Sequence, residues 1–320
     1  MNRIILFLLT AFLLFISCTK EIEIEIPEQE PNLVIYSTIE PLLFPHPKSL
    51  RVSLQQSAHI SDTARYPVND ALILYYENDS LKDTLKCVDS TGIYPITKGL
   101  GDYPVQGNSY AIKVLKDGFE NVTAKTTIPP KVMIKDTVVT PIAYFDEDGG
   151  VFSEVSVTFA DPGNETNFYE LAISDIAYSY DKPHTFYRLS TYDKIITSES
   201  YYPSLLRFDL KQPRVLLFND KEINGKEHTL NVYYIPPQRE SEYRYISHHY
   251  ISIHLRNVTE EYYRFKTSML QHLYNKEEDI LYGMGEPLNV ISNINNGYGL
   301  FAGYNSDIVS IFIKEKIINN

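Results

Sequence analysis

Histidine side chains are the first candidates for chemistry in this sequence, because imidazole binds transition metals and transfers protons near neutral pH. His248, His249 and His254 fall close together in a segment that alternates like a β-strand. On a strand, His248 and His249 point to opposite faces, and His248 and His254 share one face about 20 Å apart. The spacing therefore predicts no common metal site, and we expect neither a metal nor another cofactor.

Two acidic turns carry oxygen ligands of the kind that Ca²⁺ prefers. They are Asp146–Gly150 and Asp161–Glu165. Neither has the spaced acidic pattern or the closing Glu of the twelve-residue Ca²⁺ loop, so solvated turns are the favoured interpretation. The zinc-protease helix motif, the Walker loop and the Gly-x-Ser-x-Gly elbow are also missing from the sequence. We therefore expect no catalytic residues; a hydrolase with a site dispersed over the second half of the chain is the alternative.

Cys18 is the residue with the strongest chemical signal, and that signal is lipidation. It follows an apolar run, Ile4–Ile16, of about 13 residues, which suits a signal peptide and is short for a transmembrane helix of roughly 20. The phrase Phe15-Ile16-Ser17-Cys18 resembles a bacterial lipobox, with Phe15 where Leu is usual. We expect residues 1–17 to be a lipoprotein signal peptide and Cys18 to carry acyl chains. A signal peptide cut elsewhere, or an uncleaved anchor, is the alternative.

Residues 18–31 follow as an acidic segment. Glutamate alternates with isoleucine there, and two prolines interrupt it, which favours a lipidated acidic tether. An edge strand added to the next domain is the alternative. Thr19-Lys20-Glu21 resembles the acidic patches that direct Bacteroidetes-type lipoproteins to the outer leaflet.

Charge and cysteine content limit the partners. The chain of 320 residues has a net charge of −12, which argues against nucleic acid and against anionic lipid as partners. It has two cysteines. If Cys18 carries lipid, Cys87 has no disulfide partner in the chain, and we expect it to be a small buried residue on a strand.

Tyrosine is the unusual residue of this composition, with 26 Tyr and no Trp. Tyrosine suits β-strands, where one of each adjacent pair faces the core, and it also suits recognition surfaces. The candidate surface residues are Tyr201, Tyr202, Tyr243 and Tyr245, together with the region Tyr178–Tyr192. The sequence leaves core and surface use open.

The elements that must position these residues are mostly strands. Over 32–129, about seven short alternating segments are separated by turns rich in Gly, Asn, Asp and Ser, which predicts a β-sandwich of immunoglobulin or transthyretin type. Tyr110 lies near the start of a late strand and is a candidate tyrosine corner. Pro129 and Pro130 place a domain boundary.

Residues 130–320 predict a larger β-rich domain with one amphipathic helix. Thr259 can cap the helix, with Glu260 and Glu261 in its first turn. Apolar residues then recur at helical spacing: Tyr262, Phe265, Met269, Leu270, Leu273 and Tyr274. The Gly- and Asn-rich segment 283–304 predicts a loop with positive φ angles and close backbone packing.

Several phrases spread over the mature chain carry a family resemblance. They are Ser17-Cys18 with Lys20–Ile24, Pro31–Ile35, Pro67–Ala71, Thr126–Pro130, Phe159–Glu165, Glu261–Tyr263, Glu286–Ile294 and Gly299–Tyr304. Together they resemble the Bacteroidetes-type outer-membrane lipoproteins grouped as domain of unknown function 4249. The phrase Gly299–Tyr304 is the most specific of them.

This resemblance implies a lipid-anchored protein of the outer membrane, exposed at the cell surface, with no catalytic residues to carry over. It also implies a TonB-dependent receptor as partner in nutrient uptake. We therefore expect a non-enzymatic accessory binding protein whose ligand the sequence does not indicate. A surface adhesin or structural interaction module is the alternative.

Overall fold

The structure is a computed structural model that describes residues 30–41, 50–59, 62, 64–96, 103–147, 149–163, 165–175, 185–196, 213–236, 248–282 and 288–314. Within these ranges the chain is mostly β and contains one helix, which confirms the predicted fold class. No helix in this part of the chain is both long and apolar enough to cross a membrane.

The helix is α2 (Glu260–Tyr282), and its bounds agree with the predicted start after Thr259. The strands are β1 (Leu33–Ile39), β2 (Arg51–Gln56), β3 (Tyr66–Pro67), β4 (Leu72–Glu77), β5 (Ser80–Leu85), β6 (Ile93–Pro95), β7 (Ser109–Leu115), β8 (Val122–Thr127), β9 (Ile134–Phe145), β10 (Val151–Ala160), β11 (Phe168–Asp175), β12 (Leu189–Ser190), β13 (Leu216–Asn219), β14 (Glu227–Tyr234), β15 (His248–Val258) and β16 (Tyr298–Lys314).

These strands form one large and two smaller sheets. The large sheet has eight strands in the order β13-β11-β15-β16-β1-β2-β3, with β6 also paired to β2. The smaller sheets have four strands each, in the orders β12-β14-β10-β9 and β5-β4-β7-β8.

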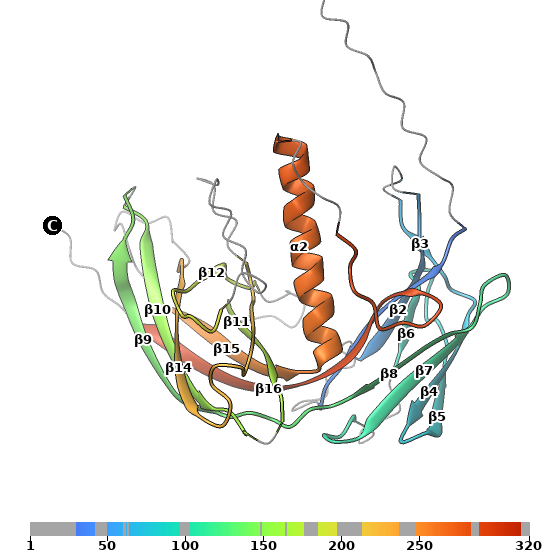
Figure 1. The fold of residues 1–320 in the computed structure, drawn as a ribbon, viewed down its shortest axis with the longest axis horizontal. Helices are drawn as coiled ribbons and strands as arrows, with labels where there is room; N and C mark the ends of the chain where they lie inside the picture. Colours follow the sequence, from blue (N-terminus) through green and yellow to red (C-terminus); the bar gives the residue numbers. More distant parts are fainter. Residues whose placement is uncertain are drawn as a thin grey trace, which may run out of the picture.

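Strand β16 shows how the layers are arranged, because successive side chains of a strand alternate between its faces. Phe301 packs in the core beneath β4, β7 and β8, and Ile313 packs in the core beneath β10 and β14. Both are odd-numbered and share a face. Leu300 and Ala302 lie on the other face and pack with α2. The two small sheets therefore cover one face of the large sheet, and α2 rises from the opposite face (Figure 1).

The two sandwiches share β16. Its first residues, 298–303, pair in parallel with β1, and residues 304–314 pair antiparallel with β15. The predicted loop over 283–304 is therefore wrong from Tyr298 onward, where the strand begins. The division into 32–129 and 130–320 stays a prediction, but a strand of the second segment completes the sheet of the first.

Gly299 explains why a glycine-rich phrase can be a strand here. Its φ is +112°, and a Cβ added to it would lie 1.9 Å from the carbonyl oxygen of Ile35 on β1. Only glycine allows this close approach of the two backbones. Asn293 supports the same segment, because its side-chain amide donates to the oxygen of Phe301 (2.7 Å) and accepts from its nitrogen (3.0 Å). The expected positive φ and close packing are thus confirmed.

The residues around the predicted boundary are hydrogen-bonded to the centre of the large sheet. The amide of Asn257 on β15 donates to the carbonyl oxygen of Pro130 (3.0 Å). The side-chain amide of Asn305 on β16 donates to the carbonyl oxygen of Pro129 (3.2 Å). Proline carbonyls accept these bonds although proline has no N–H to donate.

A buried polar network attaches α2 to the large sheet. The carboxylate of Glu170 on β11 pairs with Arg256 on β15 and accepts from the hydroxyl of Tyr262 on α2 (2.8 Å). The guanidinium of Arg256 lies 5.2 Å from the ring centre of Tyr304 on β16, whose hydroxyl donates to Glu40 (2.7 Å). Burial raises the pKa of Tyr304, so its hydroxyl keeps the proton that it donates.

Two local predictions have different outcomes. The hydroxyl of Tyr110 accepts from the backbone nitrogen of Val105 (2.7 Å) and donates to Glu77 (2.8 Å), which confirms the tyrosine corner. The hydroxyl of Thr259 is buried and has no hydrogen-bond partner among the described residues, so the predicted side-chain cap of α2 is wrong. The backbone N–H of Thr259 donates instead to the oxygen of Gly303 (3.1 Å), which continues the β15–β16 ladder up to the helix.

Cys87 also differs from its prediction. Strand β5 ends at Leu85, so Cys87 lies in the turn after it and is only partly buried. Its thiol donates to the carbonyl oxygen of Asp89 (2.7 Å). The carboxylate of Asp89 accepts from the nitrogen of Thr91 (3.0 Å), and this local bond favours a turn over a continued strand.

Candidate recognition surface

Most of the tyrosines predicted as surface residues lie outside the described ranges. This holds for Tyr201, Tyr202, Tyr243 and Tyr245, and also for the lipidation residue Cys18, so their roles stay predictions. In the region Tyr178–Tyr192, by contrast, two tyrosines are described. Tyr187 is partly buried against the core, with its ring centre 5.1 Å from that of Tyr234, so the surface prediction is wrong for it, whereas Tyr192 is 84% exposed. Tyr192 contacts Tyr233 on β14 and so lies at a surface of the sheet β12-β14-β10-β9.

The side chains of strand β14 alternate between the core and this surface. Leu230, Val232 and Tyr234 are fully buried beneath the sheet. The residues between them, among them Asn231 and Tyr233, point away from the core. The adjacent pair Tyr233-Tyr234 therefore divides between surface and core, as the strand pattern predicts.

Four aromatic side chains contact one another in a row at this face: Tyr192 is exposed, Tyr233 and Tyr144 are half-buried, and Phe152 at the inner end is buried. The ring centres of Tyr192 and Tyr233 are 6.0 Å apart, and those of Tyr233 and Tyr144 are 5.4 Å apart, both edge to face. Tyr144 stacks on Phe152 at 4.6 Å. We call these four residues the aromatic row. They come from the segment after β12, from β14, from β9 and from β10, so the β9–β10 hairpin and the pairing of β14 with β10 and β12 bring them together.

The hairpin of β9 and β10 positions the inner half of the row. The register shifts between Phe152 and Glu154, which face Tyr144 and Thr140 on β9. Pro141 lies in the shifted part of β9, where a residue without an N–H is tolerated. Its carbonyl oxygen accepts from the hydroxyl of Ser153.

The hydroxyls of Tyr144 and Tyr233 stay protonated at neutral pH. Burial raises the pKa of Tyr233, and the nearby Glu154 and Tyr192 raise it further. Burial likewise raises the pKa of Tyr144, with smaller contributions from Tyr192, Tyr233 and Asp146. Protonated phenols donate hydrogen bonds, so the row combines apolar ring faces with polar donors.

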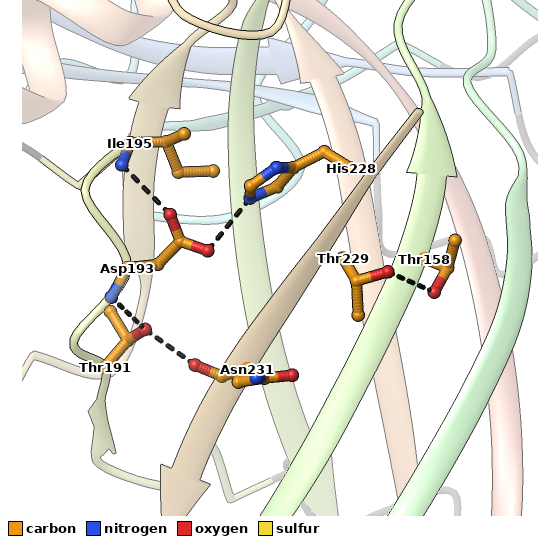
Figure 2. A network of polar contacts seen from close by, with 7 residues as sticks. All are labelled: Thr158, Thr191, Asp193, Ile195, His228, Thr229 and Asn231. Atoms are coloured by element: carbon orange, nitrogen blue, oxygen red, sulfur yellow. Dashed lines mark hydrogen bonds and ion pairs between the residues drawn. The ribbon is translucent and has the colours of Figure 1, made fainter. Parts of the chain in front are cut away.

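Hydrogen bonds fix the segment that carries Tyr192 (Figure 2). The hydroxyl of Thr191 donates to the carbonyl oxygen of Asn231 on β14 (2.6 Å) and accepts from the nitrogen of Asp193 (3.1 Å). The carboxylate of Asp193 accepts from the nitrogen of Ile195 (3.1 Å) and lies 2.9 Å from Nε2 of His228 on β14. Tyr192 lies between these two anchors.

The His228–Asp193 pair is also the arrangement that could transfer protons. In hydrolases such a pair orients a histidine toward a nucleophile. Here both oxygens of Asp193 are engaged, one by the backbone and one by the imidazole. The nearby hydroxyls of Thr158 and Thr229 lie 2.8 Å from each other across β10 and β14 (Figure 2). The observed contacts therefore assign the pair a positioning role for residues 191–196.

The other histidine prediction concerned a metal. His254 on β15 is buried, and its Nε2 lies 3.0 Å from the hydroxyl of Ser174. Its ring lies 5.7 Å from that of Phe186. Among the described residues, no group of three His, Cys, Asp or Glu side chains could hold a metal ion. The side chains of His248 and His249 lie outside the described part of the molecule.

The two acidic turns differ from each other. Asp161 is only 5% exposed, and its carboxylate accepts from the hydroxyl of Tyr169 (2.5 Å) and the nitrogen of Gly225 (2.8 Å). The solvated-turn interpretation is therefore wrong for Asp161, because protein donors replace water. Asp146 instead closes the β9–β10 hairpin, and its backbone nitrogen donates to the oxygen of Gly150 (2.9 Å).

The fold and the aromatic row define a β-sandwich protein with a partly exposed aromatic row that ends in the exposed Tyr192. The chain belongs to the family described as Domain of unknown function (DUF4249), whose model matches residues 19–308. The match covers most of the chain and confirms the grouping as domain of unknown function 4249, while the Bacteroidetes-type and outer-membrane parts of the resemblance stay predictions.

Comparisons with single proteins add little. Among the curated proteins no match is found. The chain is 10% identical to the major pilin subunit BcpA of Bacillus cereus, with a TM-score of 0.20, and the similarity covers 71% of this chain and 65% of the pilin. A protein described as membrane anchored, from Corynebacterium diphtheriae, is also 10% identical, with a TM-score of 0.19 and coverages of 72% and 55%. The chain thus spans less than two thirds of either protein.

Proposed function

We propose that this protein is a non-enzymatic binding protein, held at the surface of the outer membrane by lipid on Cys18. The aromatic row is its recognition surface. Within its family it is a Bacteroidetes-type lipoprotein whose residues 1–17 are the signal peptide and 18–31 the tether. Its partner is a TonB-dependent receptor, for which it acts as an accessory protein in nutrient uptake.

The aromatic row is the observation that supports a binding role. Tyrosine buries a large area on contact at a small entropic cost, and it is enriched at the centres of interfaces. Edge-to-face and stacked contacts hold Tyr144 and Tyr233 in place before any ligand arrives. The anchors of 191–196 do the same for the more exposed Tyr192. Such preorganisation lowers the cost of binding.

The anchor and the receptor partner rest on sequence. The apolar leader, the lipobox-like phrase before Cys18 and the acidic segment after it support export and lipidation. Two or more acyl chains are sufficient for stable anchoring in a bilayer. The TonB-dependent partner follows from the family resemblance of the mature chain.

Co-purification of the native, lipidated protein tests the proposal. Wild type, a Y192A/Y233A double variant and a Y250A control are extracted in detergent, and the bound proteins are identified by mass spectrometry. Tyr250 is a suitable control, because it is exposed on β15, in the large sheet, and pairs with Phe312. We expect wild type and Y250A to recover a TonB-dependent receptor and the double variant to recover at least about tenfold less.

Three outcomes would contradict the proposal. Failure of wild type to recover any such receptor counts against the transport role. Recovery of host or matrix proteins instead would favour an adhesin. Equal recovery by the double variant and the control would exclude the aromatic row, provided that both variants unfold at the wild-type temperature.

A further inference from the structure

A second exposed apolar surface lies on the other side of the molecule, around α2. It consists of side chains that are 39–50% exposed, which we call the helix-side surface: Tyr36, Met269, Leu273, Leu288, Ile291 and Tyr298. Single exposed apolar residues are ordinary in proteins, whereas a contiguous group marks a contact surface.

Contacts between the elements show that these residues are neighbours. The rings of Tyr36 on β1 and Phe265 on α2 are 6.1 Å apart. Tyr298 is in register with Val34 on β1, two residues before Tyr36 and on the same face. Strand β1 and the start of β16 thus present their tyrosines beside the helix.

The segment after α2 closes the surface on the other side. The nitrogen of Ile291 donates to the hydroxyl of Ser268 (2.9 Å), and the carbonyl oxygen of Leu288 lies 2.8 Å from Nδ1 of His272. On α2, Met269 comes directly after Ser268, and Leu273 comes directly after His272. Because Met269 and Leu273 are four residues apart, they share a face of the helix.

The tether enters the fold at this surface. Asn32 is fixed by two hydrogen bonds with Ser57, from its nitrogen to the hydroxyl (2.9 Å) and from the Ser57 nitrogen to its carbonyl oxygen (2.8 Å). Two residues later, Val34 pairs with Tyr298. From Cys18 to Asn32 the chain can span at most about 50 Å. The start of β1 and the far end of α2 lie on the same side of the molecule (Figure 1).

We propose that the helix-side surface contacts the headgroup region of the bilayer that holds the lipid on Cys18. Tyrosine and aliphatic side chains favour this region of a membrane. A weak surface is sufficient, because the tether keeps its local concentration near the bilayer high. The inference rests on the proposed anchor and adds a defined orientation of the protein on the membrane.

Two cations near this surface, both in the part of α2 whose side chains the structure describes, already have partners. Lys266 lies 5.4 Å from the ring centre of Tyr262, and Arg264 pairs with Glu260 at 3.6 Å. Attraction to anionic lipid therefore contributes little, and contact should be equal on zwitterionic and anionic vesicles.

The absence of tryptophan from the sequence makes a direct test simple, since one introduced tryptophan is the only one in the protein. Full-length lipidated L273W and, as a second reporter, M269W are reconstituted into phosphatidylcholine vesicles with or without brominated acyl chains. The control is L81W, because Leu81 on β5 is 55% exposed and belongs to a small sheet on the opposite face. We expect bromine to quench L273W and M269W about twofold or more and to leave L81W unchanged.

The outcomes separate this inference from the proposed function. Vesicle flotation without quenching of either reporter would overturn the membrane contact and leave the anchor intact. Failure of the protein to float would overturn the anchor and this inference with it. If the emission of L273W or M269W changes when a receptor is added but not when brominated lipid is present, the surface contacts a protein partner. That result would overturn the lipid contact.

Discussion

At the scale of single residues, Gly299 shows most sharply how close packing depends on one residue. Replacing Gly299 by alanine adds a Cβ that clashes with the β1 backbone. Gly107 is a matched control, because its φ is +82° and an added Cβ would meet no described atom within 4 Å. We expect G107A to cost about 1–2 kcal/mol for the left-handed backbone, and G299A to cost on the order of 3 kcal/mol or more. Urea unfolding measures both, and equal losses would contradict the close approach of β1 and β16.

Asp220 provides a prediction about pH. It is buried, and burial raises the pKa of its carboxyl, with Asp161 adding to the effect and the bond from the Asn167 nitrogen (2.8 Å) opposing it. A carboxyl with a higher pKa in the folded than in the unfolded chain favours folding in acid. It costs stability once the pH exceeds both values.

Replacing Asp220 by asparagine should therefore raise the unfolding temperature at pH 7, because the amide oxygen can still accept from Asn167 without carrying a charge. The gain should shrink as the pH falls through the acidic range. Scanning calorimetry from pH 3 to 8 checks this, with the exposed Asp117→Asn as control. A loss of stability at pH 7 would show that the charge of Asp220 is needed.

At the scale of elements, the segment 191–196 depends on Asp193. Replacing Asp193 by alanine removes the acceptor of the Ile195 nitrogen and the partner of His228. We expect a loss of about 1–3 kcal/mol and faster backbone hydrogen exchange in 191–196, which carries Tyr192. Thr158→Val is the control, since the hydroxyl that it removes pairs with Thr229 and lies outside the anchors of 191–196. Unchanged exchange in the aspartate variant would mean that other contacts hold the segment.

The strands and the helix could be predicted from the sequence where their residues follow a local hydrophobic pattern. Alternation predicts strands such as β10 and β14, and the spacing after Thr259 predicts α2. The parallel pairing of β1 with β16 could not be predicted, because it joins residues more than 250 positions apart and no periodicity encodes such a register. The glycines and asparagines around the start of β16 are typical of a loop, so the sequence predicts a loop there. In the structure, Gly297 and Gly299 instead allow the backbones of β16 and β1 to approach closely.

The candidate site shows the same limit. The excess of tyrosine left core and surface use open, and Tyr192 lies in one of the regions named as surface candidates. Tyr144 and Phe152 were not singled out, since each is ordinary for a strand. They form a row with Tyr233 only after β9, β10 and β14 pair. The signal available was the hairpin turn Asp146–Gly150, which places Tyr144 and Phe152 opposite each other.

At the scale of the whole molecule, β16 makes two sandwiches into one unit. The strand carries Phe301 into one core and Ile313 into the other, and β15 and β16 bind the carbonyls at Pro129 and Pro130. We therefore predict a single unfolding transition by calorimetry. The G299A variant should shift that whole transition to lower temperature. Two resolved transitions, of which only one moves, would contradict the shared strand.

The lipid that we propose on Cys18 connects the parts of the proposed function, since surface exposure, the membrane contact of the helix-side surface and the receptor partner all depend on it. The most direct test is the intact mass of the mature protein purified from native membranes, with fragmentation of its N-terminal peptide. We predict a chain that begins at Cys18 and carries a diacylglyceryl group on sulfur and an acyl group on nitrogen. A chain that begins at Thr19, or an unmodified Cys18, would contradict the anchor and the function built on it.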